Sequence, residues 1–242
     1  MAVIISASRR EDMPAFHFDE LMKKYKNYPQ DSFWVLWTKN PVHLIDSGID
    51  FKRTALQLTI TGLGGTDLEP NVPPFERVFW LSEQLIEQGF NPALVNWRLD
   101  PLIPGRHSPA LVKKLAGRAS SLGITRCVTS FITWYGKVST RWPEGAKTQV
   151  SKEKQREIAQ EVRDILFSNG ITLYGCAQEH LKDLIQPSRC IDGEYYGTVT
   201  GMDFSQDKDT SQRKTCGCTK SVDIGKYRQC GHGCLYCYAR PA

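Results

Sequence analysis

Three cysteines near the C-terminus lie close enough in sequence for one loop to wrap around a metal cluster. Cys230, Cys234 and Cys237 have the spacing Cys-x3-Cys-x2-Cys in the stretch CGHGCLYCYA. Three thiolates can hold three irons of a four-iron, four-sulfur cluster and leave the fourth iron open to a ligand from outside the protein, whereas a closed structural zinc site has four protein ligands. The spacing therefore favours an iron–sulfur site, with a zinc loop or a redox patch of thiols as the alternative.

Four further cysteines are candidates for a second metal site. Cys176 follows an apolar run, Cys190 comes fourteen residues later, and Cys216 and Cys218 form the stretch CGC. Four thiolates suit a closed zinc site or a second iron–sulfur cluster. Four unrelated thiols are the alternative, since spacing does not establish that they are close together. Cys127 lies inside an apolar run, where we expect a buried small hydrophobic residue.

Short apolar runs separated by helical patterns indicate an α/β fold with a parallel sheet. Helical spacing marks residues 75–86 and 158–166, and Gly89, Gly123 and Gly170 follow helical segments as C-terminal caps. The sequence predicts a partial or complete TIM-like (βα) barrel, or an open doubly wound sheet, with ligands at the carboxyl ends of the strands. The predicted strands are 3–6, 33–37, 55–60, 93–97, 127–132 and 171–174.

Charged residues follow several of these predicted strands. Arg9 comes after the first and Lys39 after the second, where they could bind a substrate phosphate or carboxylate, or form surface salt bridges. Arg98 and Asp100 end the fourth strand, where they could bind polar groups of a ligand or form an internal ion pair. We take Arg98, Asp100 and Lys39 as candidate catalytic residues.

Bulk composition is that of an ordinary globular protein. The chain has 242 residues, 40% of them hydrophobic, and a net charge of +5, enough for a substantial core but only a mild preference for anionic partners. We predict a barrel domain at residues 1–186 and a cysteine-rich, metal-binding segment at 187–242, loop-rich with little helical periodicity, docked on the barrel mouth. No run has the length of a membrane span and no signal peptide is evident, so we expect a cytoplasmic protein without a membrane partner.

The cysteine loop CGHGCLYCYAR resembles the cluster-binding loop of radical S-adenosylmethionine (radical SAM) enzymes, most closely the branch related to spore photoproduct lyase. An upstream stretch is also similar to that branch, although in the familiar arrangement it follows the cluster loop. The chain thus resembles a circularly permuted radical SAM protein and is identified as a member of a bacterial family of unknown function (DUF1848). The matching upstream positions are Thr59, Thr61, Glu69, Pro70, Pro74, Arg77, Gly89, Pro101, Pro104 and Gly105.

This resemblance implies a [4Fe-4S] cluster, S-adenosylmethionine and a tail that lies over the barrel mouth as a lid. The cysteines of the loop would hold the cluster, Tyr236 would lie against the adenine, and Arg9, Thr59 and Thr61 would contribute to cofactor binding. His232 would act as a donor that orients the cluster. The implied activity is hydrogen abstraction by a 5′-deoxyadenosyl radical, with an electron donor such as flavodoxin or ferredoxin and an unknown small-molecule or nucleic-acid substrate.

Two other functions are compatible with the same residues. A metal-stabilised nucleic-acid-binding module would use the arginines and lysines of the barrel mouth and would bind zinc, with salt-dependent affinity. An iron–sulfur electron-transfer protein would hold one or two clusters and act on no organic substrate. Cleavage of S-adenosylmethionine distinguishes the radical enzyme from both.

Overall fold

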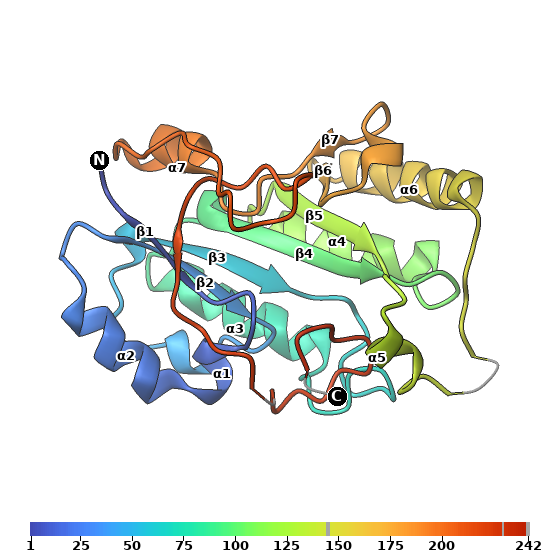
Figure 1. Ribbon diagram of the computed structural model, residues 1–242, viewed down its shortest axis with the longest axis horizontal. Helices are drawn as coiled ribbons and strands as arrows, with labels where there is room; N and C mark the ends of the chain where they lie inside the picture. Colours follow the sequence, from blue (N-terminus) through green and yellow to red (C-terminus); the bar gives the residue numbers. More distant parts are fainter. Residues whose placement is uncertain (144–145, 229, 241–242) are drawn as a thin grey trace.

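One parallel sheet forms the centre of the computed structural model, which describes residues 1–143, 146–228 and 230–240 (Figure 1). Within these residues the strands lie in the order β7-β6-β5-β4-β3-β2-β1-β8, and every neighbouring pair is parallel. The sheet is not closed, so β7 and β8 are its two edges. The strands are β1 (Ile4–Ala7), β2 (Phe33–Thr38), β3 (Thr54–Thr59), β4 (Val95–Leu102), β5 (Arg126–Phe131), β6 (Thr172–Gly175), β7 (Gln186–Pro187) and β8 (Val222–Asp223).

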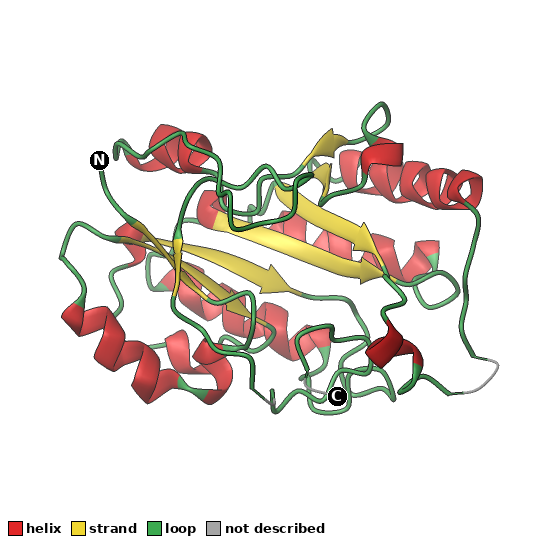
Figure 2. Ribbon diagram, in the orientation of Figure 1, coloured by secondary structure: helices red, strands yellow, loops and turns green. Residues whose placement is uncertain are grey.

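Helices connect successive strands, as Figure 2 shows. Parallel neighbours joined by right-handed crossovers place their helices on one face of the sheet, and α4 packs between α3 and α6 behind the strands in Figure 1. The α-helices are α1 (Met13–Phe16), α2 (Phe18–Asn27), α3 (Phe75–Glu87), α4 (Pro109–Ser121), α5 (Gly136–Ser139), α6 (Lys152–Phe167) and α7 (Gly193–Thr200), with 3-10 turns at Val42–Leu44, Phe51–Arg53, Pro92–Leu94 and Glu179–Leu181.

β2 and β3 are mostly apolar and buried along almost their whole length because both faces of the sheet are covered. Trp34 of β2 and Trp97 of β4 are almost completely buried. The predicted glycine caps are confirmed: Gly89, Gly123 and Gly170 follow α3, α4 and α6 with φ values of +96°, +74° and +72°. These left-handed conformations end each helix and turn the chain back into the next strand.

The expected α/β class and the parallel sheet are confirmed, and each of the six predicted runs contributes a strand. The order has no switch point, so the doubly wound alternative is not observed. The sequence did not predict β7 and β8. Both are two residues long.

The C-terminal segment is joined to the rest of the chain through the sheet and the core. The predicted boundary between residues 186 and 187 falls inside β7, and β8 adds to the edge of β1 by pairing Ile5 with Val222. Contrary to the weak helical pattern, the segment also contains α7, whose Tyr196 is buried in the main core. In the described ranges, no helix combines the length and apolar character that a membrane span needs.

Candidate functional site

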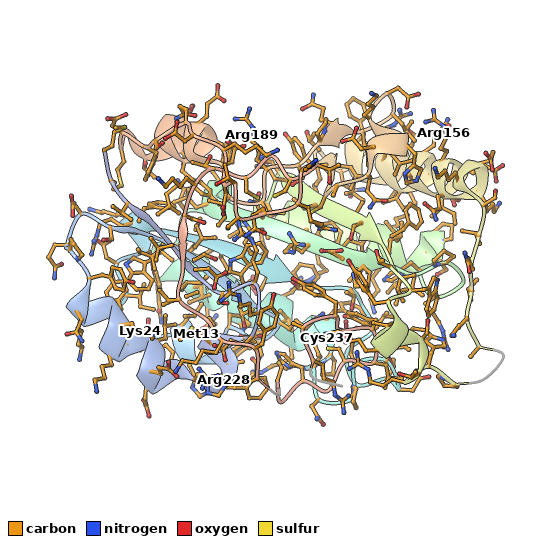
Figure 3. All side chains as sticks on the ribbon, in the orientation of Figure 1. Met13, Lys24, Arg156, Arg189, Arg228 and Cys237 are labelled. Atoms are coloured by element: carbon orange, nitrogen blue, oxygen red, sulfur yellow. The ribbon has the colours of Figure 1, made fainter. Side chains whose placement is uncertain are left out.

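A cavity of about 550 Å³ lies at the carboxyl ends of the strands. Its walls come from the ends of β3, β4 and β5, from the segments after β1, β2, β5 and β6, and from the C-terminal segment. Cys237, labelled in Figure 3, lies on the side of the sheet to which the strand arrows point. Seven cysteines line this one cavity: Cys176, Cys190, Cys216, Cys218, Cys230, Cys234 and Cys237. The eighth, Cys127, is fully buried in β5 and does not line it.

The cysteines of the Cys-x3-Cys-x2-Cys loop face the cavity from its C-terminal wall. Cys234 is buried, while Cys230 and Cys237 are half-buried. Burial raises the pKa of Cys230 and raises the pKa of Cys234 to about 12. The loop therefore brings one buried and two half-buried thiols to the lining of the same cavity.

His232 fixes this loop to the sheet. Its Nε2 atom lies 2.7 Å from Oδ2 of Asp12, and the two side chains are buried. The same carboxylate oxygen accepts hydrogen bonds from Thr38 Oγ1 at 3.0 Å and from the Lys39 backbone N–H at 2.8 Å. Asp12 thus ties the ends of β1 and β2 to the cysteine loop.

Backbone contacts hold the loop on its other sides. The Asn71 side chain donates to the Gly231 carbonyl at 2.8 Å, the Leu235 N–H donates to Leu68 at 3.0 Å, and Arg141 donates to the Cys237 carbonyl at 2.6 Å. These contacts come from the segment after β3 and the segment after α5. The loop is therefore enclosed by residues from four parts of the chain.

A close approach explains one glycine of the loop. A Cβ atom on Gly231 would lie 2.4 Å from the Phe16 ring, so only glycine fits there without movement. Gly233 has a φ of +67°, the left-handed conformation that the expected tight turn needs. The first glycine is required by space and the second by backbone conformation.

Tyr236 takes part in a buried polar network. Lys39 Nζ lies 2.8 Å from Glu69 Oε1 and 2.9 Å from the Tyr236 hydroxyl, which also contacts Glu69. Thr61 donates to the same carboxylate oxygen at 2.7 Å. Burial opposes both charges, but their mutual attraction raises the pKa of Lys39 and lowers the pKa of Glu69. Burial and the charge of Glu69 raise the pKa of Tyr236, so its hydroxyl remains a hydrogen-bond donor.

The other four cysteines, which sequence spacing alone could not bring together, form a second group in the same cavity. Cys190 Sγ lies 3.8 Å from Cys176 Sγ, and Cys218 contacts both Cys190 and Cys216. Hydrogen bonds with Cys176 and Cys218, helped by the charge of Arg98, lower the pKa of Cys190 well below its ordinary value. A hydrogen bond with Cys218 lowers the pKa of Cys216 to about 6.

Two arginines adjoin this second group. Arg98 Nη1 donates to Cys190 Sγ at 3.1 Å, and its Nη2 pairs with Asp100, whose other oxygen accepts from Ser130 at 2.5 Å. Both terminal nitrogens of Arg9 are buried without a hydrogen-bond acceptor among the described residues, and Asp223 Oδ2 is 3.9 Å from Nη1. The cavity therefore has a positively charged wall beside its four-cysteine group.

The structure gathers most of the sequence-predicted site residues around the cavity. Besides the seven cysteines, its lining includes Arg9, Lys39, Thr59, Arg98, Asp100 and Tyr236. Thr61 is different, because it is 1% exposed and lies behind Glu69 instead of lining the cavity.

The sequence analysis did not identify Asp12 or Glu69 as site residues. Asp12 precedes Met-Pro, a pattern typical of a helix N-cap, and it does accept from the Ala15 N–H at 3.0 Å. The N-cap role accounts for Asp12 locally, so nothing in the sequence indicated its contact with His232, which lies 220 positions away. In the sequence, Glu69 stood out only as one of the positions that match the radical SAM branch.

The donor set fits the groups that the sequence predicts. Thiolates are the soft ligands that iron–sulfur clusters and zinc accept, and seven cysteines line this one cavity. Over residues 1–143, 146–228 and 230–240, no group of three or more His, Cys, Asp or Glu side chains is arranged so that it could hold a metal ion.

The chain matches the model of a protein family. The family model described as "Domain of unknown function (DUF1848)" matches residues 4–239, which include both cysteine groups. No curated protein matches the chain. The family match therefore covers the sheet, the cavity and the C-terminal segment as one unit.

Proposed function

Because the chain belongs to the DUF1848 family and lines one cavity with three closely spaced thiols, we propose that it is a radical SAM enzyme. Cys230, Cys234 and Cys237 would hold a [4Fe-4S] cluster. The observation that carries the proposal is that these three thiols line a cavity of about 550 Å³ at the carboxyl ends of parallel strands. That is the place where such sheets bind ligands, and three protein ligands leave one iron open.

The connectivity supports a partial barrel of the circularly permuted radical SAM type. β8 directly precedes the cysteine loop and pairs in parallel with β1, matching Ser6 with Asp223. The remaining strands continue from β1 in chain order. The loop therefore follows a strand at one end of a singly wound sheet, although that strand comes last in the sequence.

Bound cluster and cofactor would supply electron transfer to S-adenosylmethionine and thereby a 5′-deoxyadenosyl radical that abstracts hydrogen from the substrate. The chain's own residues position and enclose these groups. Arg9 and Thr59 line the cavity as donors for polar groups of a ligand. Tyr236 lines the cavity while its hydroxyl is held by Glu69 and Lys39, which makes Lys39 a positioning residue for Tyr236.

Arg98 and Asp100 would bind the substrate. Both line the cavity, and Ser130 fixes the Asp100 carboxylate. A fixed ion pair offers a donor and an acceptor to a polar substrate without having to reorganise when it binds. We also propose that a protein such as flavodoxin or ferredoxin delivers the electron. The same proposal places the protein in the cytoplasm.

The test is anoxic purification of the full chain with iron and sulfide analysis and electron paramagnetic resonance of the reduced protein. We expect a four-iron signal that S-adenosylmethionine perturbs, followed by release of 5′-deoxyadenosine. Replacement of Cys234 by alanine should abolish both, whereas Cys127→Ala, which removes a buried thiol outside the cavity, should preserve them. A cluster that is insensitive to S-adenosylmethionine would instead favour electron transfer, and a protein with zinc but no iron would favour the metal-stabilised binding module.

A further inference from the structure

We propose that Cys176, Cys190, Cys216 and Cys218 bind a single zinc ion that joins the two edges of the open sheet. This site is separate from the cluster at Cys230, Cys234 and Cys237 and does not depend on radical chemistry. Its role is to hold in place the segment that leads into β8 and the cysteine loop.

The spacing of the sulfurs fits one ion better than a cluster. At a Zn–S distance of about 2.3 Å, two sulfurs of a regular tetrahedron are separated by about 3.8 Å. The Sγ atoms of Cys176 and Cys190 are 3.8 Å apart. An iron–sulfur cluster would place iron and sulfide between the cysteine sulfurs and separate them further.

The four cysteines form a chain of neighbours in the order Cys176, Cys190, Cys218, Cys216. Cys190 and Cys218 occupy its middle and are buried, whereas Cys176 and Cys216 are its ends and are half-buried. The residues with room to turn are therefore the two that must approach each other around an ion. Among the described residues no three His, Cys, Asp or Glu side chains are arranged around one point, so zinc binding would require the two end residues to turn toward the ion.

Charge around the group matches a zinc tetrathiolate. Four thiolates and one Zn²⁺ carry a net charge of −2, and the guanidinium groups of Arg9 and Arg98 lie on this side of the cavity. Arg98 donates to Cys190 Sγ at 3.1 Å, and the Ile191 N–H donates to Cys218 Sγ at 3.4 Å. N–H donors to coordinating atoms orient metal ligands and offset their charge.

Arg9 provides an independent indication. Its two terminal nitrogens are buried and have no hydrogen-bond acceptor among the residues in the described ranges. The nearest carboxylate oxygen, on Asp223, is 3.9 Å away. Burying a guanidinium with so little compensation is costly beside neutral thiols, but the cost falls when the adjacent sulfurs carry negative charge.

The position of the ligands in the fold shows what the ion would do. Cys176 follows β6 and Cys190 follows β7, at one edge of the sheet, whereas Cys216 and Cys218 precede β8 at the other edge. Between α7 and β8 the described chain has no helix or paired strand beyond the isolated bridges Ala2–Phe204 and Lys208–Thr219. A metal ion is an effective cross-link for such an irregular segment.

The test uses the full chain and zinc itself. Protein purified in air should contain about one zinc per chain, and X-ray absorption at the zinc edge should show four sulfur ligands at about 2.3 Å. The double variant Cys190→Ala/Cys218→Ala should lose zinc, whereas a Cys230→Ala/Cys234→Ala/Cys237→Ala variant should keep it. Cys127→Ala is the matched single-thiol control and should also retain the metal.

Other results would overturn this site and would be distinguishable from failure of the radical proposal. Iron that persists after replacement of the three loop cysteines would identify a second iron–sulfur cluster instead of zinc. If the protein contained neither zinc nor iron, or if the zinc had fewer than four sulfur ligands, the four cysteines would not form one metal site. Because the double variant could unfold, Cys216→His provides a second measurement: it retains a zinc ligand and should bind zinc with one nitrogen and three sulfurs.

Discussion

His232 Nε2 and Asp12 Oδ2 lie 2.7 Å apart, although the two residues are separated by 220 positions in the sequence. Asp12 also accepts from Thr38 and from the Lys39 backbone, so its position is set by the first two strands. The cysteine loop therefore docks onto a carboxylate that is already fixed. This contact joins the last segment of the chain to the first.

Replacing His232 with alanine should loosen the loop. Loss of a hydrogen bond to a charged group costs about 1.5–3 kcal/mol, which increases loop opening by about 10- to 100-fold. We expect faster tryptic cleavage in the segment that contains Lys226 and Arg228 and a lower iron content after anoxic purification. The exposed His43 provides a control, since His43→Ala should change neither measurement. Equal protection of wild type and His232→Ala would show that the contact does not hold the loop.

Replacing Lys39 with methionine should destabilise the fold strongly. The Glu69 side chain is 1% exposed, and leaving a buried charge without its partner costs about 3–5 kcal/mol. Addition of Glu69→Gln should recover most of this loss because the unpaired charge is then removed. Chemical denaturation of the single and double variants measures the coupling.

The exposed pair of Lys114 and Glu76, at 2.9 Å, serves as the comparison for Lys39. Lys114→Met should cost less than about 1 kcal/mol, as is usual for surface ion pairs. Similar effects of Lys39→Met and Lys114→Met would mean that burial does not determine the strength of the Lys39–Glu69 pair.

Gly231→Ala should displace the cysteine loop by steric overlap. The added Cβ would lie 2.4 Å from the Phe16 ring, and overpacking of this kind costs about 1–3 kcal/mol. Iron retention should fall and should recover in the double variant Phe16→Ala/Gly231→Ala, because the second change removes the obstructing ring. Gly117→Ala, in open space within α4, should be neutral or stabilising. If iron retention does not recover in the double variant, overlap with the Phe16 ring is not the cause of the loss.

The interior strands were predictable because each contains a short run of mostly apolar, buried residues. β2 and β3 are buried along almost their whole length, and burial on both faces leaves that pattern in the sequence. β8 was not predictable, because its two residues pair with β1 through a contact that only the tertiary fold creates. α7 was missed because few apolar residues mark its buried face.

The site shows the same division between local and long-range information. The spacing of Cys230, Cys234 and Cys237 is local and identified their loop directly. Proximity of Cys190 to Cys218 depends on the path of the chain from one sheet edge to the other, which no spacing encodes. The resemblance assigned Thr61 to cofactor binding. In the structure the Thr61 hydroxyl donates a hydrogen bond to the Glu69 carboxylate.

Arg98→Met should weaken zinc binding at the four-cysteine group without removing a ligand. Arg98 donates to Cys190 Sγ at 3.1 Å and contributes positive charge beside the proposed dianionic centre. Loss of such a supporting donor lowers metal affinity by about 10- to 100-fold, which competition with a chromophoric chelator would measure. Arg126→Met is the matched control, because Arg126 pairs with Asp192 at 3.5 Å, packs against Tyr195 and does not line the cavity. If the two variants lose zinc equally, the effect belongs to general destabilisation. A selective loss in Arg98→Met would instead show that this arginine acts on the metal through Cys190.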